Sequence, residues 1–347
     1  MPHSPVDITE FLSLQNALVV DVRSPGEFAQ ARIPGALSMP LFSDAQRAEI
    51  GTLYKQAGKE KAMLHALDYY GPNVKLIVTQ LQAELKQRGK TSFDKSDVVV
   101  QCWRGGMRSG VVCWMLDLFG YEVRQLQGGY KTFRRWALKQ LEKDYNVVVL
   151  GGRTGAAKTE TLLALAKHNE RIVDLEGLAQ HKGSAFGGLG FASAPSQEQF
   201  ENDLAWSLRA HDTGERIWFE DESQRIGLCT VPNKLWSSMR KANVFYLDVP
   251  FEVRLEHLAR VYGAFPISQL IDATVRIRKK LGGQQMQQAI DLLDKKQLKD
   301  AFAILLRYYD KAYDEATSKR KPDSIIRITT DTVDPETNAQ LLLNAIT

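Results

Sequence analysis

The chain has 347 residues, enough for two domains, and its 44% hydrophobic and 25% charged residues are typical of a folded globular protein rather than a disordered one. No apolar run is long enough to cross a bilayer, and Met1-Pro2-His3-Ser4 does not begin like a secretion signal. The three cysteines suit neither a disulfide framework nor a paired zinc site. We therefore expect a cytoplasmic protein with no membrane contact and no redox cofactor.

Residues 1–142 are predicted to form one α/β domain with a parallel sheet. The run Ala17–Val22 is expected to be a buried strand, and Asp21 and Arg23 near its end are expected to hold the fold together. From about 41 to 97 the pattern changes to helix-type periodicity, which predicts a helical insertion. This insertion either covers the sheet or helps to hold the substrate.

A cysteine-containing loop follows the apolar run Val98–Val100 in the same domain. It reads Cys102-Trp103-Arg104-Gly105-Gly106-Met107-Arg108-Ser109, and an apolar helical pattern follows it. Because glycine tolerates positive φ, the backbone can curl and point successive N–H groups inward, which makes a site for an anion. Such a site and nearby arginines favour the thiolate form of a cysteine. We predict Cys102, Arg104 and Arg108 as catalytic residues, with Cys102 as the nucleophile.

The domain resembles the rhodanese family of sulfurtransferases. The resemblance rests on the segments DVRSPGEF and RIPGA, on the cysteine loop, and on Gly128-Gly129-Tyr130 before a helix. Rhodanese loops resemble Cys-x4-Arg, whereas the loop from Cys102 to Arg108 is one residue longer, as in rhodanese-like phosphatases. A longer loop predicts a wider cradle, suited to a larger atom or to a tetrahedral oxyanion.

A second domain follows a basic helix predicted at 130–145. The expected strand Asn146–Leu150 leads into Gly151-Gly152-Arg153-Thr154-Gly155-Ala156-Ala157-Lys158-Thr159, which precedes an apolar helical pattern. Strand, glycine-rich turn, Lys-Thr and helix in this order are typical of a phosphate-binding P-loop. Ala157 stands where the usual pattern has glycine, which favours phosphate or diphosphate binding over nucleotide hydrolysis. The predicted diphosphate-binding residues are Gly152, Thr154, Gly155, Lys158 and Thr159.

The rest of this P-loop domain, expected at 143–250 and 323–347, is predicted to be a nucleotide-kinase-like α/β sheet. Acids at its strand ends could orient a proton transfer or hold Mg²⁺ together with Thr159, and the metal requirement stays open. Strands are expected at 171–176, 216–222, 243–249 and 324–329, with a last helix at 335–346.

The glycine-rich segment 180–190 is expected to be a mobile loop over the phosphate site. His181 in this loop is either a general base or phosphate contact or a structural residue. Glu220 and Glu222 would share one face of a strand if the strand reached that far. The predicted second-site contacts are His181, Lys182, Ser184, Glu220, Glu222 and Arg225.

Residues 251–322 are predicted to form a basic helical subdomain. They contain 14 Lys and Arg against 9 Asp and Glu, a net charge of +5, whereas the whole chain has +4. A basic helical surface is typical of RNA binding, although a solvated helix face would have the same composition. The predicted RNA-binding residues are Arg276, Arg278, Lys279, Lys280 and Arg307.

Four segments, QCWRGGMRSG, GGRTGAAKTE, HKGSAFGGLG and FEDESQRIG, make the chain similar over nearly its whole length to tRNA 2-selenouridine synthases. The resemblance implies a bacterial transferase that acts on wobble 2-thiouridine in tRNAs for Lys, Glu and Gln. Geranyl diphosphate would first alkylate the sulfur, and selenium from selenophosphate would then displace the geranylated sulfur. A selenophosphate-supplying enzyme would be a partner. In this scheme Cys102 carries or positions selenium, and Arg104 and Arg108 hold the phosphate.

Two other functions fit the same motifs. The protein could be a sulfurtransferase or a Cys-x5-Arg phosphatase that acts on thiosulfate or on a phosphate ester. It could also be a tRNA-binding module, regulated by ATP or GTP, whose rhodanese-like domain only relays sulfur. Assays with thiosulfate and phosphate esters would test the first alternative, and nucleotide titration would test the second.

Overall fold

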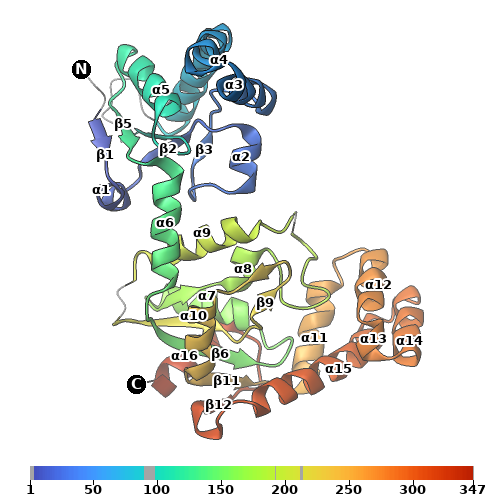
Figure 1. Ribbon diagram of the computed structural model, residues 1–347. Coiled ribbons are helices and arrows are strands. Elements are labelled where there is room, and N and C mark those ends of the chain that lie inside the picture. The colour runs from blue at the N-terminus through green and yellow to red at the C-terminus, as the bar shows by residue number, and fades with distance from the viewer. Residues whose placement is uncertain (1–3, 90–97, 192, 212–213, 347) are drawn as a thin grey trace. The chain divides into compact units, whose positions relative to one another are not determined.

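The computed structural model describes residues 4–89, 98–191, 193–211 and 214–346. The chain divides into two compact units, Met1–Gln140 and Leu141–Thr347. Each unit contains a five-stranded sheet in which all paired strands run parallel, and helices flank both sheets (Figure 1). The predicted α/β fold class is therefore confirmed. Among the described helices, none has both the length and the apolar composition needed to span a bilayer.

The N-terminal sheet has the strand order β1-β5-β4-β2-β3. Its central strand β4 is fully buried, as expected for a run of β-branched valines in a parallel sheet covered on both faces. At the end of β2, Arg23 donates hydrogen bonds to Asp21 (2.7 Å) and to the carbonyl of Ala31, so these two residues do hold the fold together. The strands are β1 Ser4–Val6, β2 Leu18–Asp21, β3 Leu37–Ser38, β4 Val98–Gln101 and β5 Val123–Leu126.

Two long helices, α3 (Asp44–Ala57) and α4 (Lys59–Gln87), pack on each other within this unit. Gly58 joins them with φ 89°, a conformation that favours glycine. Both helices lie within the helical insertion predicted at about 41–97. Most of the buried residues of α4, such as Ile77 and Leu81, lie in its second half and pack into the core of the unit. The other helices are α1 Ile8–Ser13, α2 Pro25–Gln30, α5 Met107–Leu118 and α6 Gly129–Leu141.

The C-terminal sheet has the order β12-β11-β6-β8-β7, with β6 in the centre. All four strands predicted after β6 are shorter than expected, and β7 and β8 end earliest relative to their predicted ends. Strand β7 ends at Val173 because the side chain of Asp174 caps helix α8, and β8 ends at Glu220. The elements are β6 Asn146–Gly152, α7 Lys158–Lys167, β7 Arg171–Val173, α8 Leu175–Ala179, α9 Gln197–Leu208, β8 Arg216–Glu220, β9 Arg225–Ile226, β10 Cys229–Thr230, α10 Asn233–Lys241, β11 Val244–Asp248, η1 Pro322–Ser324, β12 Ile325–Thr329 and α16 Pro335–Ile346.

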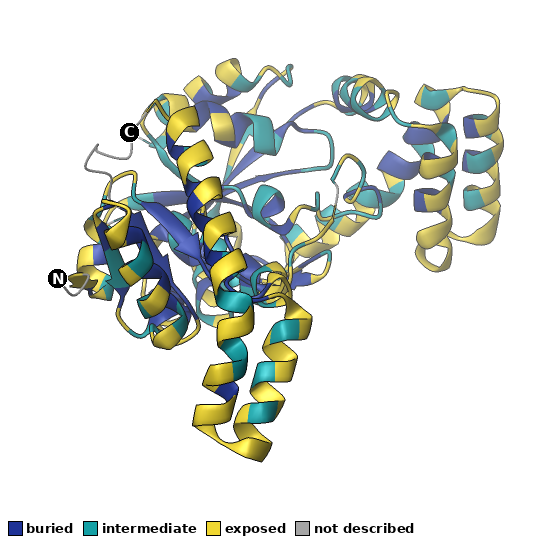
Figure 2. Ribbon diagram, turned by 90° about the horizontal axis from the view of Figure 1, so that it is seen from above, coloured by how far each residue is buried: buried dark blue, intermediate teal, exposed yellow. Residues whose placement is uncertain are grey.

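Five consecutive helices lie between β11 and β12 and enclose an apolar core of their own. Phe186 from the glycine-rich segment inserts into this core, where its ring contacts Tyr262 and Phe302. The buried strands and the largely exposed outer helix faces are visible in Figure 2. The helices are α11 Phe251–Tyr262, α12 Ile267–Arg276, α13 Arg278–Leu281, α14 Gly283–Asp294 and α15 Leu298–Ser318.

Candidate functional sites

The Cys102 side chain lies directly after β4 and is only 3% exposed. Its Sγ is 3.2 Å from the hydroxyl oxygen of Ser109, in the first turn of α5. Gly105 allows the loop to close, with φ 59°; a Cβ there would come within 2.4 Å of the carbonyl oxygen of Leu126. The curl predicted from the two glycines is therefore present, and it holds the sulfur at the N-terminus of a helix.

Carbonyl groups of this loop accept hydrogen bonds from other parts of the unit, whereas backbone N–H groups of the loop are not used as donors toward the described residues. The carbonyls of Cys102 and Trp103 accept hydrogen bonds from the backbone of residues 130 and 131, at 2.9 and 3.1 Å. The Gln125 side chain donates to the Gly105 carbonyl and to Ser109. Within the described part of the chain, the N–H groups of residues 103–106 have no acceptor, and the helix start leaves those of 107–109 free as well. This arrangement is an anion cradle around the sulfur.

The two predicted arginines of the loop have different environments. Arg104 is exposed. Arg108 donates to the carboxylate of Glu27 at 2.8 Å, and Arg47 pairs with the same carboxylate at 3.0 Å. Burial alone would raise the pKa of Glu27, but the hydrogen bond and charge of Arg108 outweigh it and lower this pKa to about 2. Glu27 also closes the capping box of α2 with Ser24, and the Ser-x-x-Glu spacing is the signal that could have identified it.

The other two cysteines are buried and have weakly acidic thiols. Burial, followed by the charge of Cys102, raises the pKa of Cys113 to about 12. Burial raises the pKa of Cys229 to about 11. A thiol must ionise to act as a nucleophile, so Cys102 in its cradle is the cysteine suited to chemistry.

The second site is the P-loop between β6 and α7. A negative φ would have accommodated the methyl group of Ala157 easily, but Ala157 adopts φ 55° and ψ 41°, the left-handed conformation. Gly155 also has a positive φ and packs against Leu258, where a Cβ would come within 2.9 Å. The amino group of Lys158 folds back and donates to the carbonyl of Gly152 at 3.1 Å. The chain thus forms the predicted loop, with strain at Ala157.

Three buried glutamates surround the lysine of the P-loop. Glu176 accepts a hydrogen bond from the Thr159 hydroxyl at 3.0 Å, and Glu220 has no hydrogen-bond partner among the described residues. Burial, and then the charge of Glu176, raises the pKa of Glu222 to about 8. Burial alone would lower the pKa of Lys158, but nearby acidic groups including Tyr313 and Glu222 raise it. A cationic lysine therefore stands among partly neutral carboxyl groups.

Most of the predicted phosphate contacts share one small cavity. It has a volume of about 90 Å³ and is lined by Thr154, Gly155, Lys158, Thr159, Lys182 and Ser184, among others. Gly152 contributes through its carbonyl on Lys158. Glu222 is not on a strand with Glu220, because β8 has ended, but both still influence Lys158 electrostatically. Among the described residues, no group of three or more His, Cys, Asp or Glu is arranged to hold a metal ion.

Four predicted second-site residues do not line this cavity: Glu220 and Glu222, whose charges act on Lys158, and also Arg225 and His181. Arg225 is exposed and donates to the carbonyl of Gly227. The His181 ring packs between the backbones of Gly187 and Gly227, where added Cβ atoms would come within 2.8 and 2.7 Å of it. Burial, and then the charge of Arg276, lowers the pKa of His181. These contacts favour a structural role for His181, and they explain part of the glycine content of the segment.

Sequence reasoning missed the residues that support the P-loop from α11 and α15. The buried guanidinium of Arg254 donates to the carbonyl of Thr154 at 3.1 Å and forms an ion pair with Asp310 at 2.7 Å. Tyr313 lines the cavity, and its ring centroid is 5.1 Å from the Lys158 nitrogen. The sequence pattern that could have identified Tyr313 is weak. It is the spacing of Tyr309 and Tyr313, which are one helical turn apart and so face the same side of α15.

Comparisons with known proteins find matches for both units of the chain. Residues 145–341 match the family model described as tRNA 2-selenouridine synthase AAA domain, and residues 4–136 match the rhodanese-like domain. A curated relative from Shewanella frigidimarina (strain NCIMB 400), named tRNA 2-selenouridine synthase, is 33% identical over 82% of this chain and 80% of its own length. The chain belongs to the tRNA 2-selenouridine synthase family.

Two further relatives carry the same name. The protein from Sulfurovum sp. (strain NBC37-1) is 32% identical over 87% of this chain and 89% of its own length. The protein from Hydrogenovibrio crunogenus (strain DSM 25203 / XCL-2) is 33% identical over 91% of this chain and 93% of its own length. The similarity to other tRNA 2-selenouridine synthases therefore extends across both units.

In this member of the tRNA 2-selenouridine synthase family, the predicted RNA-binding residues are on the surface of the helical region. Four of them are exposed cations at the end of α12 and in α13, namely Arg276, Arg278, Lys279 and Lys280. Arg307 on α15 is exposed as well, with its guanidinium 5.5 Å from the ring centroid of Phe251. We name the first four residues the α12–α13 patch. Its concentration of positive charge suits a polyanion.

Proposed function

We propose that this protein forms 2-selenouridine at the wobble position of tRNA, by geranylating 2-thiouridine and then replacing the geranylated sulfur with selenium. The main support for this proposal is that one chain contains two anion sites, the Cys102 cradle and the Gly152–Thr159 loop. The chain also belongs to a family whose relatives are named tRNA 2-selenouridine synthase. The substrates are wobble 2-thiouridine in tRNAs for Lys, Glu and Gln, geranyl diphosphate and selenophosphate. An enzyme that makes selenophosphate is the partner, and the cytoplasm is the setting.

The first step is assigned to the P-loop. The allylic carbon–oxygen bond of geranyl diphosphate breaks, a carbon–sulfur bond forms at the 2-thio group, and the base loses its N3 proton. The departing diphosphate carries the electron pair, and Lys158 with the N–H groups at the start of α7 would stabilise its charge. Mg²⁺ bound with the diphosphate would take the Thr159 hydroxyl as a ligand and would neutralise further charge.

The second step is assigned to the Cys102 cradle. Selenium bonds to C2 of the base, the C2–sulfur bond breaks, and geranyl thiolate takes the electron pair. Water then cleaves the selenium–phosphorus bond and releases phosphate, which leaves 2-selenouridine. The open N–H groups of residues 103–106 would bind the phosphate oxygens, Arg104 and Arg108 would add charge, and Cys102 would carry or position the selenium.

Mass spectrometry of tRNA nucleosides tests this proposal directly. Purified protein should give geranylated 2-thiouridine with geranyl diphosphate alone, and 2-selenouridine when selenophosphate is also present. Cys102→Ser should abolish selenation and keep geranylation, whereas Lys158→Ala should lower geranylation more than selenation of a tRNA that is already geranylated. Full selenation by Cys102→Ser would contradict the assignment of Cys102. Turnover of thiosulfate or a phosphate ester, with no tRNA product, would favour a sulfurtransferase or a phosphatase instead.

A further inference from the structure

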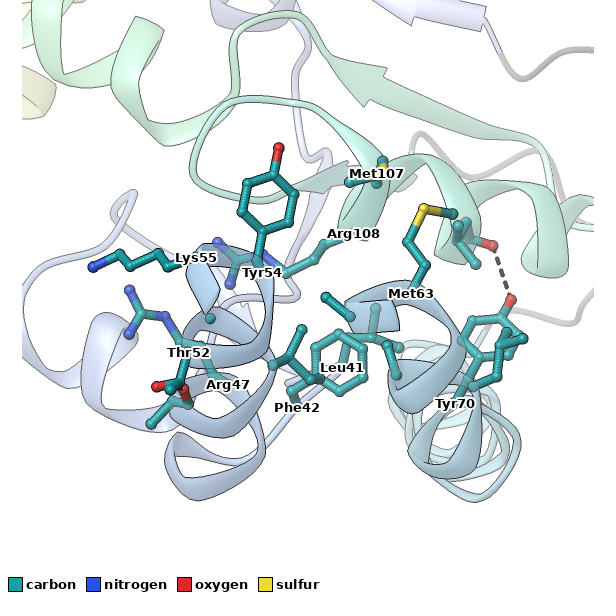
Figure 3. Close-up of a pocket in the computed structure, with 17 residues that line it drawn as sticks. Leu41, Phe42, Arg47, Thr52, Tyr54, Lys55, Met63, Tyr70, Met107 and Arg108 are labelled. Carbon is teal, nitrogen blue, oxygen red and sulfur yellow. Dashed lines mark hydrogen bonds between the residues drawn. The ribbon is translucent and has the colours of Figure 1, made fainter. Parts of the chain in front are cut away.

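An apolar pocket of about 660 Å³ lies beside the Cys102 loop, between α3, α4 and the first turns of α5 (Figure 3). Its walls include Leu41, Phe42, Met63 and Tyr70, and Val111 of α5. Pockets that hold small ligands have volumes of about 300–1,000 Å³ and mainly apolar walls. Of the predicted catalytic and diphosphate-binding residues, Arg108 alone lines this pocket.

The pocket gathers large apolar side chains that are exposed to solvent. Tyr54 is 53% exposed, Leu67 64% and Met107 56%, and all three line the same space. Scattered apolar side chains on a surface need no explanation, but a contiguous group inside one pocket indicates a ligand or partner that covers it. The helical insertion therefore does more than cover the sheet.

One end of the pocket is cationic. Arg47, Lys55 and Arg108 belong to its lining, and Figure 3 shows their charged groups toward one end, away from Met63 and Tyr70. The Glu27 carboxylate holds two of these cations, Arg47 and Arg108, in place. An occupant with an apolar body and an anionic or electron-rich head suits this distribution of charge.

The pocket and the Cys102 cradle share residues. Met107 and Arg108 line the pocket, and the next residue, Ser109, contacts the sulfur of Cys102 at 3.2 Å. The pocket wall therefore begins where the anion cradle ends. A group that reacts at the cradle and carries an apolar chain can place that chain in the pocket.

We propose that this pocket holds the geranyl chain of the S-geranylated wobble base while selenium replaces the sulfur at the Cys102 cradle. This inference rests on the proposed function. The geranyl chain is attached to the very sulfur that leaves, so a base positioned for attack at C2 carries ten apolar carbons next to the loop. Arg108 at the shared edge lies where the departing thiolate gains its negative charge.

Occupation of the pocket makes the chain a specificity element for the second step. A tRNA with unmodified 2-thiouridine leaves the apolar walls in water, whereas the geranylated tRNA covers them and gains affinity. The enzyme thus selects the intermediate whose sulfur can leave as a thiolate. Selenophosphate then reacts with the alkylated base, because only that base has a geranyl chain that holds it at the cradle.

The test replaces two exposed pocket residues of α4, Met63→Gln with Leu67→Gln, and compares RNA stem-loops that carry S-geranyl- or S-methyl-2-thiouridine. We expect kcat/KM for selenation of the S-geranyl RNA to fall about tenfold, while the S-methyl RNA reacts at the wild-type rate. Ala66→Trp, which fills the pocket from the same helix, should give the same selective loss. Geranylation of unmodified 2-thiouridine RNA should be unchanged in both variants.

A matched control uses the same helix outside the pocket. Leu64 and Leu76 are 61% and 60% exposed and do not line it, so Leu64→Gln with Leu76→Gln should keep the wild-type preference for the S-geranyl RNA. Equal losses on the S-geranyl and S-methyl RNAs, or no loss in the pocket variants, would overturn the assignment of the pocket. If the wild-type protein neither geranylates nor selenates, the proposed function itself fails, which is a different and recognisable result.

Discussion

The carboxylate of Glu27 accepts a hydrogen bond from Arg108 at 2.8 Å, although 81 positions separate the two residues in the chain. This contact joins α2 to the start of α5 and so fixes one side of the Cys102 cradle. Arg47 of α3 binds the same carboxylate, which also links the helical insertion to the loop. A single carboxylate thus positions cations from two helices at the mouth of the apolar pocket.

We predict that Glu27→Gln lowers the free energy of unfolding by about 1–3 kcal/mol at neutral pH, because it leaves two guanidinium groups without their anion. The pKa of Glu27 is about 2 in the folded protein and 4.5 without perturbation, so the ionised form is favoured by folding. The difference between wild type and variant should be complete above pH 4.5 and should shrink as the pH falls toward 2. Denaturant unfolding at several pH values measures this difference in the free energy of unfolding. Hydrogen exchange then shows whether the effect lies in residues 1–140.

The control for this prediction is Glu10→Gln. Glu10 also pairs with an arginine, Arg124, at 2.7 Å, but its side chain is 51% exposed. An exposed pair contributes about 0–1 kcal/mol, so this variant should have little effect. A Glu27→Gln variant as stable as Glu10→Gln would show that the Glu27 carboxylate does not organise the loop.

Local sequence patterns predicted most helices and strands, but they could not predict contacts between residues that are far apart in the chain. The valines of β4, the glycines of the Cys102 loop and the last helix, Pro335–Ile346, follow from neighbouring residues alone. In contrast, Arg254 reaches the carbonyl of Thr154 across 100 positions, and no local signal announces such a pair. Asp174 ended a predicted strand, since its side chain caps α8 and turns Glu176 toward Thr159.

A second prediction concerns the strained residue of the P-loop. Ala157 adopts φ 55°, which costs an L-residue about 1–2 kcal/mol, whereas glycine adopts it freely but loses more entropy on folding. Ala157→Gly should therefore leave the free energy of unfolding unchanged or raise it by up to about 1 kcal/mol. Ala157→Val should lower it by at least about 2 kcal/mol and abolish geranyl transfer, because a β-branched side chain fits this conformation worst.

The neighbouring Ala156 provides the comparison. It is buried, 1% exposed, and its φ is not positive, so Ala156→Gly should destabilise the protein by about 1 kcal/mol. If Ala157→Gly and Ala156→Gly lower the free energy of unfolding equally, the backbone conformation of Ala157 costs the protein no strain energy.

The third prediction is a pH dependence of geranyl diphosphate binding. The pKa of Glu222 is raised to about 8, mainly by burial, so its neutral form is present below pH 8 and its contribution to stability is lost as the pH rises through 8. The new negative charge beside Lys158 should then repel the diphosphate. We expect KM for geranyl diphosphate to rise above pH 8, and Glu222→Gln to remove this rise.

Steady-state geranyl transfer across this pH range tests the idea. Glu160→Gln changes an acid that lines the P-loop cavity itself and should leave the midpoint of the KM profile near pH 8. A profile with the same midpoint in wild type and Glu222→Gln would assign the transition to another group.

The last prediction concerns the α12–α13 patch. Replacing Arg278, Lys279 and Lys280 by glutamine should weaken tRNA binding and lower the slope of log affinity against log salt by roughly one per residue, because each cation releases about one counterion from the phosphate backbone. Lys299 and Lys319 in the same helical region already pair with Glu256 and Glu315, at 2.7 and 3.0 Å, so their replacement should change this slope much less. Binding titrations at several salt concentrations distinguish a phosphate-binding surface from a merely solvated one, since on a solvated helix face both sets of variants would bind tRNA like the wild type.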